Sequence, residues 1–171
     1  RHDALYMPDS FGHIPCIPMI CNGFGIDTYI FMRGVNDDID PESRFWFWES
    51  PDGSRVQIFR LRDGYANAAR LGLHRGTGEI MDKESSEIRP KFKMEFAVEQ
   101  IRKAAEKQMD KMGEPFVLIA GTDHQIPQRE LPDIMKNAET NQYTFRYGDW
   151  DEAAEIMRKK DRASWKTYRG E

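Results

Sequence analysis

The chain has 171 residues, enough for one domain with a core of its own. Hydrophobic residues make up 39% and charged residues 32%, a balance typical of a globular protein. The net charge of −4 argues against a nucleic-acid partner, because binding phosphates requires a basic excess. No apolar run approaches the roughly 20 residues of a membrane span, so we expect no membrane partner.

The two cysteines, Cys16 and Cys21, lie close together on one predicted helix and form no disulfide framework. A reducing compartment, and hence a cytoplasmic location, is the default expectation. The chain begins at Arg1, without an initiator Met and without a signal-like segment. We therefore expect it to be a fragment of a larger protein, which could form a homo-oligomer through parts outside this chain.

The first third predicts a strand, a helix and a second strand. Residues 4–7 read as a short strand, and Ser10 can cap a helix that runs to Gly23. Residues 28–32 are β-branched and aromatic, which favours a strand with Arg33 at its end.

A β-hairpin is predicted next. Two apolar runs, residues 45–48 and 55–59, flank the sequence SPDG at 50–53, a strong turn signal. Trp46 and Trp48 alternate with phenylalanines, so one pair should face the core. An exposed tryptophan could stack on a sugar ring, but core packing is the favoured interpretation.

The second half predicts helices alternating with strands. Residues 64–90 read as mostly loop, and the polar tail 160–171 as disordered. The expected elements are a short helix near 66–71, a long helix at 94–112, a continuously apolar strand at 116–120, a helix at 129–138, a strand at 143–146 and a helix at 151–159.

Strands that alternate with helices predict an α/β fold with a mostly parallel sheet and flanking helices, as one domain over residues 1–171. Sites in such sheets form at the carboxyl ends of the strands. Asp9, Arg33 and Asp123 all follow predicted strands, so we expect them to converge at one edge.

Five segments resemble glycoside hydrolase family 38, the retaining α-mannosidases, and in particular its bacterial members. The resemblance extends from residue 6 to about residue 130. The segments are PDSFGH at 8–13, GFGID at 23–27, FMRG at 31–34, ESPDGSRV at 49–56 and GTDHQIPQ at 121–128. The resemblance implies the second half of a barrel-like (β/α) catalytic domain that acts on α-mannosides or oligosaccharides.

The resemblance also implies roles for single residues. Asp9 matches the catalytic nucleophile, which is also a zinc ligand, and Arg33 matches an arginine that contacts both nucleophile and sugar. Asp123 matches the general acid/base, and His124 would orient it or meet substrate. Tyr65 could reach the site from a loop.

This chemistry has a physical rationale. A retaining glycosidase needs a nucleophilic carboxylate and a second carboxyl about 5–5.5 Å away, which first gives a proton and later takes one. The nucleophile must be ionised, so a nearby cation helps, whereas the acid must start protonated, which requires burial or a neighbouring like charge.

Zinc is the implied cofactor, yet only Asp9 of its four expected ligands is present. The family's upstream His-X-Asp pair and its downstream histidine are missing, so the remaining ligands are expected outside this chain. Half of the sheet is missing as well, and we expect the isolated chain to be inactive. Cys16 and Met19 depart from the family's usual Gln-containing helix, without an expected effect on the chemistry.

Other interpretations stay open. The chain could belong to a metal-dependent carbohydrate deacetylase on a related fold, or to a non-catalytic carbohydrate-binding domain. Asp9 and Asp123 could each merely cap a helix, Arg33 could be a structural ion-pair partner, and His13 could be satisfied by backbone.

Two further patterns are weak. His13, Cys16 and Cys21 loosely suggest a metal site, but their spacing fits no zinc finger. Residues 72–78 are glycine-rich but lack the Gly-Lys-Ser/Thr ending of a phosphate loop.

Overall fold

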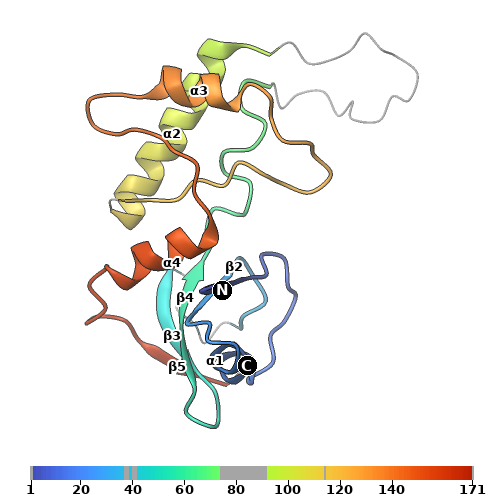
Figure 1. The fold of residues 1–171 in the computed structure, drawn as a ribbon, viewed down its shortest axis with the longest axis vertical. Coiled ribbons are helices and arrows are strands. Elements are labelled where there is room, and N and C mark those ends of the chain that lie inside the picture. Colours follow the sequence, from blue (N-terminus) through green and yellow to red (C-terminus); the bar gives the residue numbers. More distant parts are fainter. Residues whose placement is uncertain (1, 37–38, 40–41, 74–91, 114, 171) are drawn as a thin grey trace. The chain divides into compact units, whose positions relative to one another are not determined.

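The computed structural model describes residues 2–36, 39, 42–73, 92–113 and 115–170. The chain forms two compact units (Figure 1). The sheet unit comprises Arg1–Tyr65 and Gly148–Glu171, and the helical unit comprises Ala66–Tyr147.

The sheet unit contains a five-stranded sheet in the order β1-β2-β4-β3-β5. Only the β3–β4 pairing is antiparallel, so the predicted mostly parallel sheet with flanking helices is confirmed. The strands are β1 (Ala4–Tyr6), β2 (Thr28–Phe31), β3 (Phe45–Glu49), β4 (Arg55–Arg60) and β5 (Thr167–Arg169).

The predicted hairpin is present as β3 and β4. Its turn is closed by Asp52, whose carboxylate accepts from the amide and hydroxyl of Ser54, and by Gly53 at φ +86°. Trp46 and Trp48 are both buried, 1% and 5% exposed, in a core with Tyr29 and other residues of β2 and β4. Core packing therefore accounts for both tryptophans.

Two helices belong to the sheet unit, α1 (Ile17–Gly23) and α4 (Trp150–Arg158). The predicted start of the first helix is wrong, because the helix begins at Ile17 and Ser10 does not cap it. Residues 10–16 form a loop, and Pro18, which needs no amide partner, lies in the first turn of α1. The helix ends at Gly23, as predicted.

The C-terminal tail is ordered in its described part, which corrects the expectation of disorder. Thr167–Arg169 forms β5 and pairs parallel with β3. The indole of Trp48 donates to the carbonyl of Gly170 at 2.9 Å, and Arg169 pairs with Glu49 at 2.6 Å. A polar segment can add an edge strand because backbone hydrogen bonds hold it, and here Tyr168 also packs against the sheet core beside Trp46.

The helical unit packs α2 (Met94–Met112) against α3 (Leu131–Ala138). Both helices were predicted, α3 with a slightly earlier start. Their apolar faces share a core with Leu71 that includes Ala97, Ile101, Leu131, Ile134 and Ala138. No described helix is both long enough and apolar enough to cross a membrane.

Three element predictions in the helical unit are wrong. Phe116–Ala120 and Tyr143–Arg146 are not strands, and residues 66–71 form turns instead of a short helix. The amide of Ile119 donates to the side chain of Asn67 at 2.7 Å, and its carbonyl accepts from Ala68 at 2.9 Å. A loop therefore satisfies backbone groups that a neighbouring strand would otherwise bind. Residues 74–91 of the predicted loop lie outside the described residues.

Candidate active site

Asp9 and Arg33 are brought together by the register of β1 and β2. The two strands pair in parallel with Ala4 opposite Thr28 and Tyr6 opposite Ile30. The pairing continues past the strand ends, since the amide of Met32 donates to the carbonyl of Pro8 at 3.0 Å. One step further along the same register, Asp9 lies beside Arg33 at the carboxyl ends of both strands.

Arg33 Nη2 donates to Asp9 Oδ1 in an ion pair. The two side chains are 43% and 37% exposed, so the pair is open to solvent and to a ligand. The Arg33 guanidinium also lies 4.1 Å from the ring centroid of Phe11, an exposed residue in the same loop as Asp9. No second hydrogen bond to Asp9 is found among the described residues, which leaves Oδ2 available for reaction.

His13 contacts the backbone of Arg33, as the structural interpretation of this histidine predicted. Its Nε2 lies 2.8 Å from the Arg33 carbonyl oxygen, and its Nδ1 lies 2.7 Å from the hydroxyl of Tyr29. Burial lowers the pKa of His13 below its ordinary 6.5, against the opposing effect of the bond to Arg33. His13 is therefore neutral at pH 7.

Gly34 allows the loop that carries Asp9 to approach Arg33 closely. Its φ is +93°, a conformation that other residues rarely adopt. A Cβ at this position would lie 2.7 Å from the Ser10 carbonyl oxygen, 2.8 Å from the Gly12 amide nitrogen and 2.9 Å from His13 Nε2. Both the backbone and the available space therefore require glycine.

Asp123 and His124 lie in the helical unit, in a turn that follows the apolar segment. Both are exposed, and His124 has a φ of +57°, which is uncommon outside glycine. The side chain of Gln128 fixes the end of this loop by accepting from the amide of Leu71 at 3.0 Å and donating to its carbonyl at 2.6 Å. Asp123 does not follow a strand, which corrects that expectation.

Tyr65 is half-buried at the end of the first segment of the sheet unit, shortly after β4. Asp9 and Arg33 belong to the sheet unit, whereas Asp123 belongs to the helical unit. The pairing of the two carboxylates, and the substrate contacts of Tyr65 and His124, stay predictions.

The described residues do not form a metal site by themselves. Among them no group of three or more His, Cys, Asp or Glu side chains is placed to hold a metal ion. Asp9 is a single carboxylate, already paired with Arg33. Burial raises the pKa of the Cys21 thiol to about 11, and His13, Cys16 and Cys21 are not grouped as metal ligands among the residues that the structure describes.

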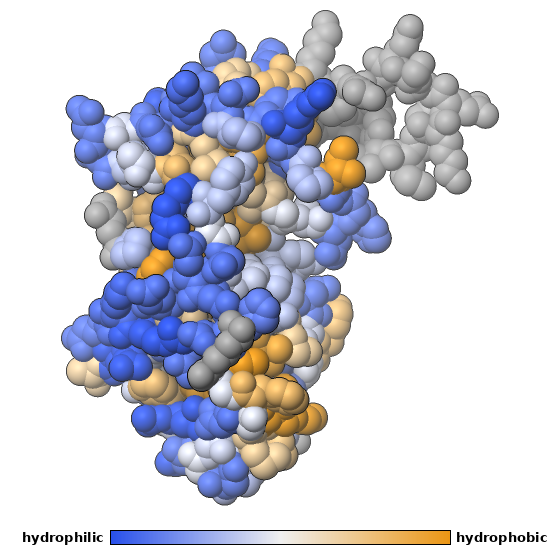
Figure 2. Space-filling view, viewed as in Figure 1, coloured by the Kyte–Doolittle hydropathy of each residue, from blue (hydrophilic) through white to orange (hydrophobic). Residues whose placement is uncertain are grey.

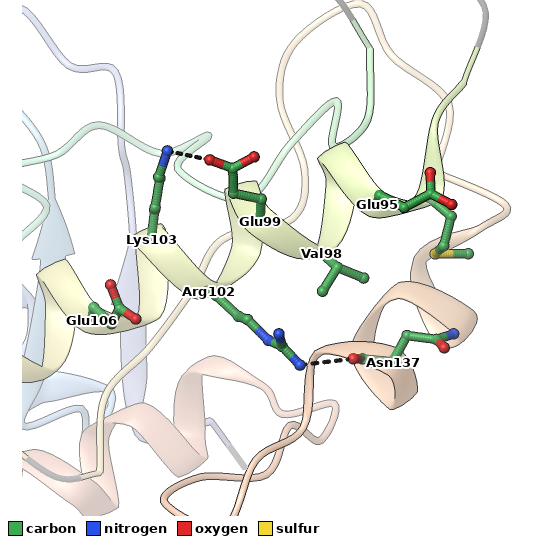
Figure 3. A pocket seen from close by; sticks show the side chains of 8 residues that line it. Glu95, Val98, Glu99, Arg102, Lys103, Glu106 and Asn137 are labelled. Carbon is green, nitrogen blue, oxygen red and sulfur yellow. Dashed lines mark hydrogen bonds and ion pairs between the residues drawn. The ribbon is translucent and has the colours of Figure 1, made fainter.

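A shallow groove of about 600 Å³ on α2 and α3 contains none of the predicted site residues (Figure 3). Its charged side chains are largely engaged with one another or with the backbone. Lys103 pairs with Glu99 at 2.5 Å, and Arg102 donates to the carbonyls of Asn137 and Ala138 at the end of α3. This pattern indicates a solvated helix face rather than a functional site.

Comparison with known protein families gives one match over residues 1–171, to the family described as the glycosyl hydrolases family 38 N-terminal domain. The chain belongs to this family. The resemblance inferred from the five sequence segments is thereby confirmed, and the domain is related to the α-mannosidases.

A curated relative of this family 38 chain is the "Putative mannosylglycerate hydrolase" of Halalkalibacterium halodurans. It is 26% identical over 150 residues, which cover 82% of this chain and 15% of the relative. The chain thus spans about a sixth of the length of the proteins it matches.

Two solved structures from Enterococcus faecalis share the fold. An α-mannosidase of strain V583 matches with a TM-score of 0.75 and 19% identity, over 98% of this chain and 17% of its own. A protein in glycosyl hydrolase family 38 matches with a TM-score of 0.53 and 13% identity, over 97% and 15%.

Sequence reasoning identified Asp9 and Arg33 but missed three residues around them. Phe11 covers the Arg33 guanidinium, Tyr29 binds His13, and Gly34 permits the close approach of the loop. Gly34 was detectable, because a glycine directly after a candidate site residue at a strand end often marks a close backbone contact. The sequence did not mark Tyr29 as a site residue, because an aromatic residue within a strand predicts packing in the core.

Proposed function

We propose that this chain supplies the nucleophile half of a retaining α-mannosidase within a longer protein. The observation that carries the proposal is the solvent-accessible Asp9–Arg33 ion pair at the carboxyl ends of two parallel strands. Sites of α/β sheets form at this edge.

In this mechanism Asp9 attacks the anomeric carbon of an α-mannoside. The C–O bond to the leaving group breaks, and a covalent mannosyl-Asp9 intermediate forms. Arg33 pairs with the Asp9 carboxylate and, being 43% exposed, can also bind the sugar through its guanidinium group. Asp123 protonates the leaving oxygen and then removes a proton from the water that releases mannose.

The family is in general metal-dependent, and we propose zinc as the cofactor of the whole enzyme. The described residues do not hold it alone, and we expect the ligands beyond Asp9 to come from outside this chain. We therefore assign no catalytic step to the metal.

The substrate class is an α-mannoside. The name of the Halalkalibacterium halodurans relative adds mannosylglycerate, a mannose joined to a small acid, to the compounds worth testing. Arg33 has exposed nitrogens that could pair with a carboxylate on such a substrate.

The decisive experiment traps the intermediate in the longer protein. We expect a fluorinated mannosyl fluoride to add one sugar to Asp9, as shown by peptide mass spectrometry. Asp9→Asn should abolish both labelling and turnover of aryl α-mannosides and mannosylglycerate, whereas Asp110→Asn, an exposed change on α2, should alter neither. A deacetylase would hydrolyse acetylated sugars without forming any adduct, and a binding domain would retain its function in Asp9→Asn.

The isolated chain should release no detectable product from an aryl α-mannoside, because it lacks most of the implied metal ligands. Hydrolysis by residues 1–171 alone would contradict this part of the proposal.

A further inference from the structure

The residues behind the Asp9–Arg33 pair form a connected chain of contacts that ends in the core. His13 bonds to the Arg33 carbonyl, Tyr29 bonds to His13, and Tyr29 is fully buried on β2.

The direction of each hydrogen bond follows from chemistry. A carbonyl oxygen only accepts, so His13 Nε2 must carry a proton and donate to Arg33. The neutral ring then has an unprotonated Nδ1, which accepts from the Tyr29 hydroxyl. Burial raises the pKa of Tyr29, so its hydroxyl keeps the proton that it donates.

The imidazole is fixed by packing as well as by hydrogen bonds. Its ring lies 4.5 Å from the centroid of Phe31 and meets the rings of Tyr29 and Trp48 edge-on at 5.5 and 5.9 Å. Three aromatic side chains of the sheet core therefore hold a ring that sits in the loop after β1.

Arg33 needs such support, because its side chain is weakly held. Its contacts are the half-exposed ion pair with Asp9 and the exposed ring of Phe11, and its buried Nε–H has no partner among the described residues. An exposed ion pair contributes at most about 1 kcal/mol, too little to fix a long side chain.

We propose that His13 and Tyr29 are positioning residues that keep Arg33 aligned on Asp9. They act on the backbone of Arg33, from which the guanidinium extends, and they touch neither the reacting carboxylate nor the substrate. The catalytic consequence rests on the proposed function, whereas the alignment of Arg33 does not.

The alignment can be tested on the 171-residue chain by NMR, without activity. Long-range proton–nitrogen spectra should show the His13 proton on Nε2 at neutral pH. The order parameter of the Arg33 Nε–H bond should be lower in His13→Leu and in Tyr29→Phe than in the wild type.

Further variants distinguish a loss of Arg33 alignment from a loss of folding. Tyr29→Phe removes a single oxygen and keeps the ring, so it preserves packing even where His13→Leu does not fold. His13→Gln keeps a donor toward the Arg33 carbonyl and should restore most of the order. Tyr143→Phe in the helical unit is the matched control and should leave Arg33 unchanged.

A proton on Nδ1, or an Arg33 side chain as ordered in Tyr29→Phe as in the wild type, would overturn the proposal. In the longer protein, Tyr29→Phe should lower kcat for an aryl α-mannoside about a hundredfold, the typical cost of misplacing a group by 1 Å. If the longer wild-type protein is inactive, the proposed function is wrong, but the NMR result on Arg33 alignment still holds. If Tyr29→Phe makes Arg33 mobile but leaves kcat unchanged, His13 and Tyr29 are not positioning residues for catalysis.

Discussion

At the scale of single residues, the geometry of the site depends on Gly34. It permits the contact between the loop after β1 and the end of β2 that brings Asp9, His13 and Arg33 together. Two separate constraints act on it, the positive φ and the absence of space for a Cβ. Other glycines of the sheet unit meet one constraint or neither, and this difference makes the two effects measurable.

Gly34→Ala should destabilise the sheet unit by more than the roughly 1–2 kcal/mol of a left-handed backbone, because its Cβ would also overlap backbone atoms of Ser10 and Gly12. Urea unfolding followed by tryptophan fluorescence measures the change. Gly53→Ala has a positive φ but open space, so it isolates the backbone cost, and Gly12→Ala has open space without a positive φ. Equal effects of Gly34→Ala and Gly53→Ala would show that the overlap is relieved at no cost.

At the scale of elements, the C-terminal end of α3 is held by a side chain of α2. Arg102 of α2 donates through Nε to the carbonyl of Ala138 and through Nη2 to the carbonyl of Asn137, both at 3.1 Å. Figure 3 shows the second contact. These carbonyls belong to the last turn of α3, where a helix has no partners of its own for them. A cation at this end also interacts favourably with the helix dipole.

Arg102→Met should lower the free energy of unfolding of the helical unit by about 1 kcal/mol, because two carbonyls lose a charged donor. Helical circular dichroism during urea unfolding is the measurement. Lys103→Met, one residue along α2, removes only an exposed pair with Glu99 and should change stability by less than about 0.5 kcal/mol. Similar costs for the two variants would show that the contacts with α3 contribute little.

The sequence predicted elements well where the local pattern decides the structure. The spacing of apolar residues identified α2, and a proline–aspartate–glycine turn identified the hairpin of β3 and β4. It failed at Phe116–Ala120, because an apolar run reports burial but not the hydrogen-bond partner, and here a loop is that partner. It failed for β5 in the opposite sense, because the polar residues around Tyr168 conceal a strand that pairs with β3 and packs one aromatic ring on the core.

Sequence reasoning on the site also succeeded where local patterns decide and failed where contacts between distant segments decide. Asp9 and Arg33 were predicted from their places at strand ends and from the resemblance. His13 was expected to bond to backbone, but its link to Tyr29 depends on contacts between distant segments, which no local pattern reports. Apolar side chains also lie on the surface (Figure 2). Phe11, Ile14 and Phe24 are exposed, although apolarity alone predicts burial.

At the scale of the whole molecule, the chain offers separate probes for its two units. All four tryptophans, Trp46, Trp48, Trp150 and Trp165, lie in the sheet unit. Most helical residues belong to α2 and α3, which lie in the helical unit. Fluorescence therefore reports the sheet unit, and circular dichroism mainly the helical unit.

Ile134→Ala should remove about 2–5 kcal/mol from the helical unit, because Ile134 is fully buried between α2 and α3. The circular dichroism transition should move to lower urea while the fluorescence transition stays in place. A common shift of both transitions would show that the two units unfold as one cooperative body.

The shared register of β1 and β2 has a consequence for how this sequence can vary in length. Residues inserted or lost in the loop between Ile14 and Ile17 would leave the ladder between the strands intact, and with it the carboxylate and its arginine. A single deletion within Thr28–Met32 would instead slip β2 by one position and set Gly34 opposite Asp9. Natural variation in chain length should therefore accumulate before α1 and be absent from the strand that follows it.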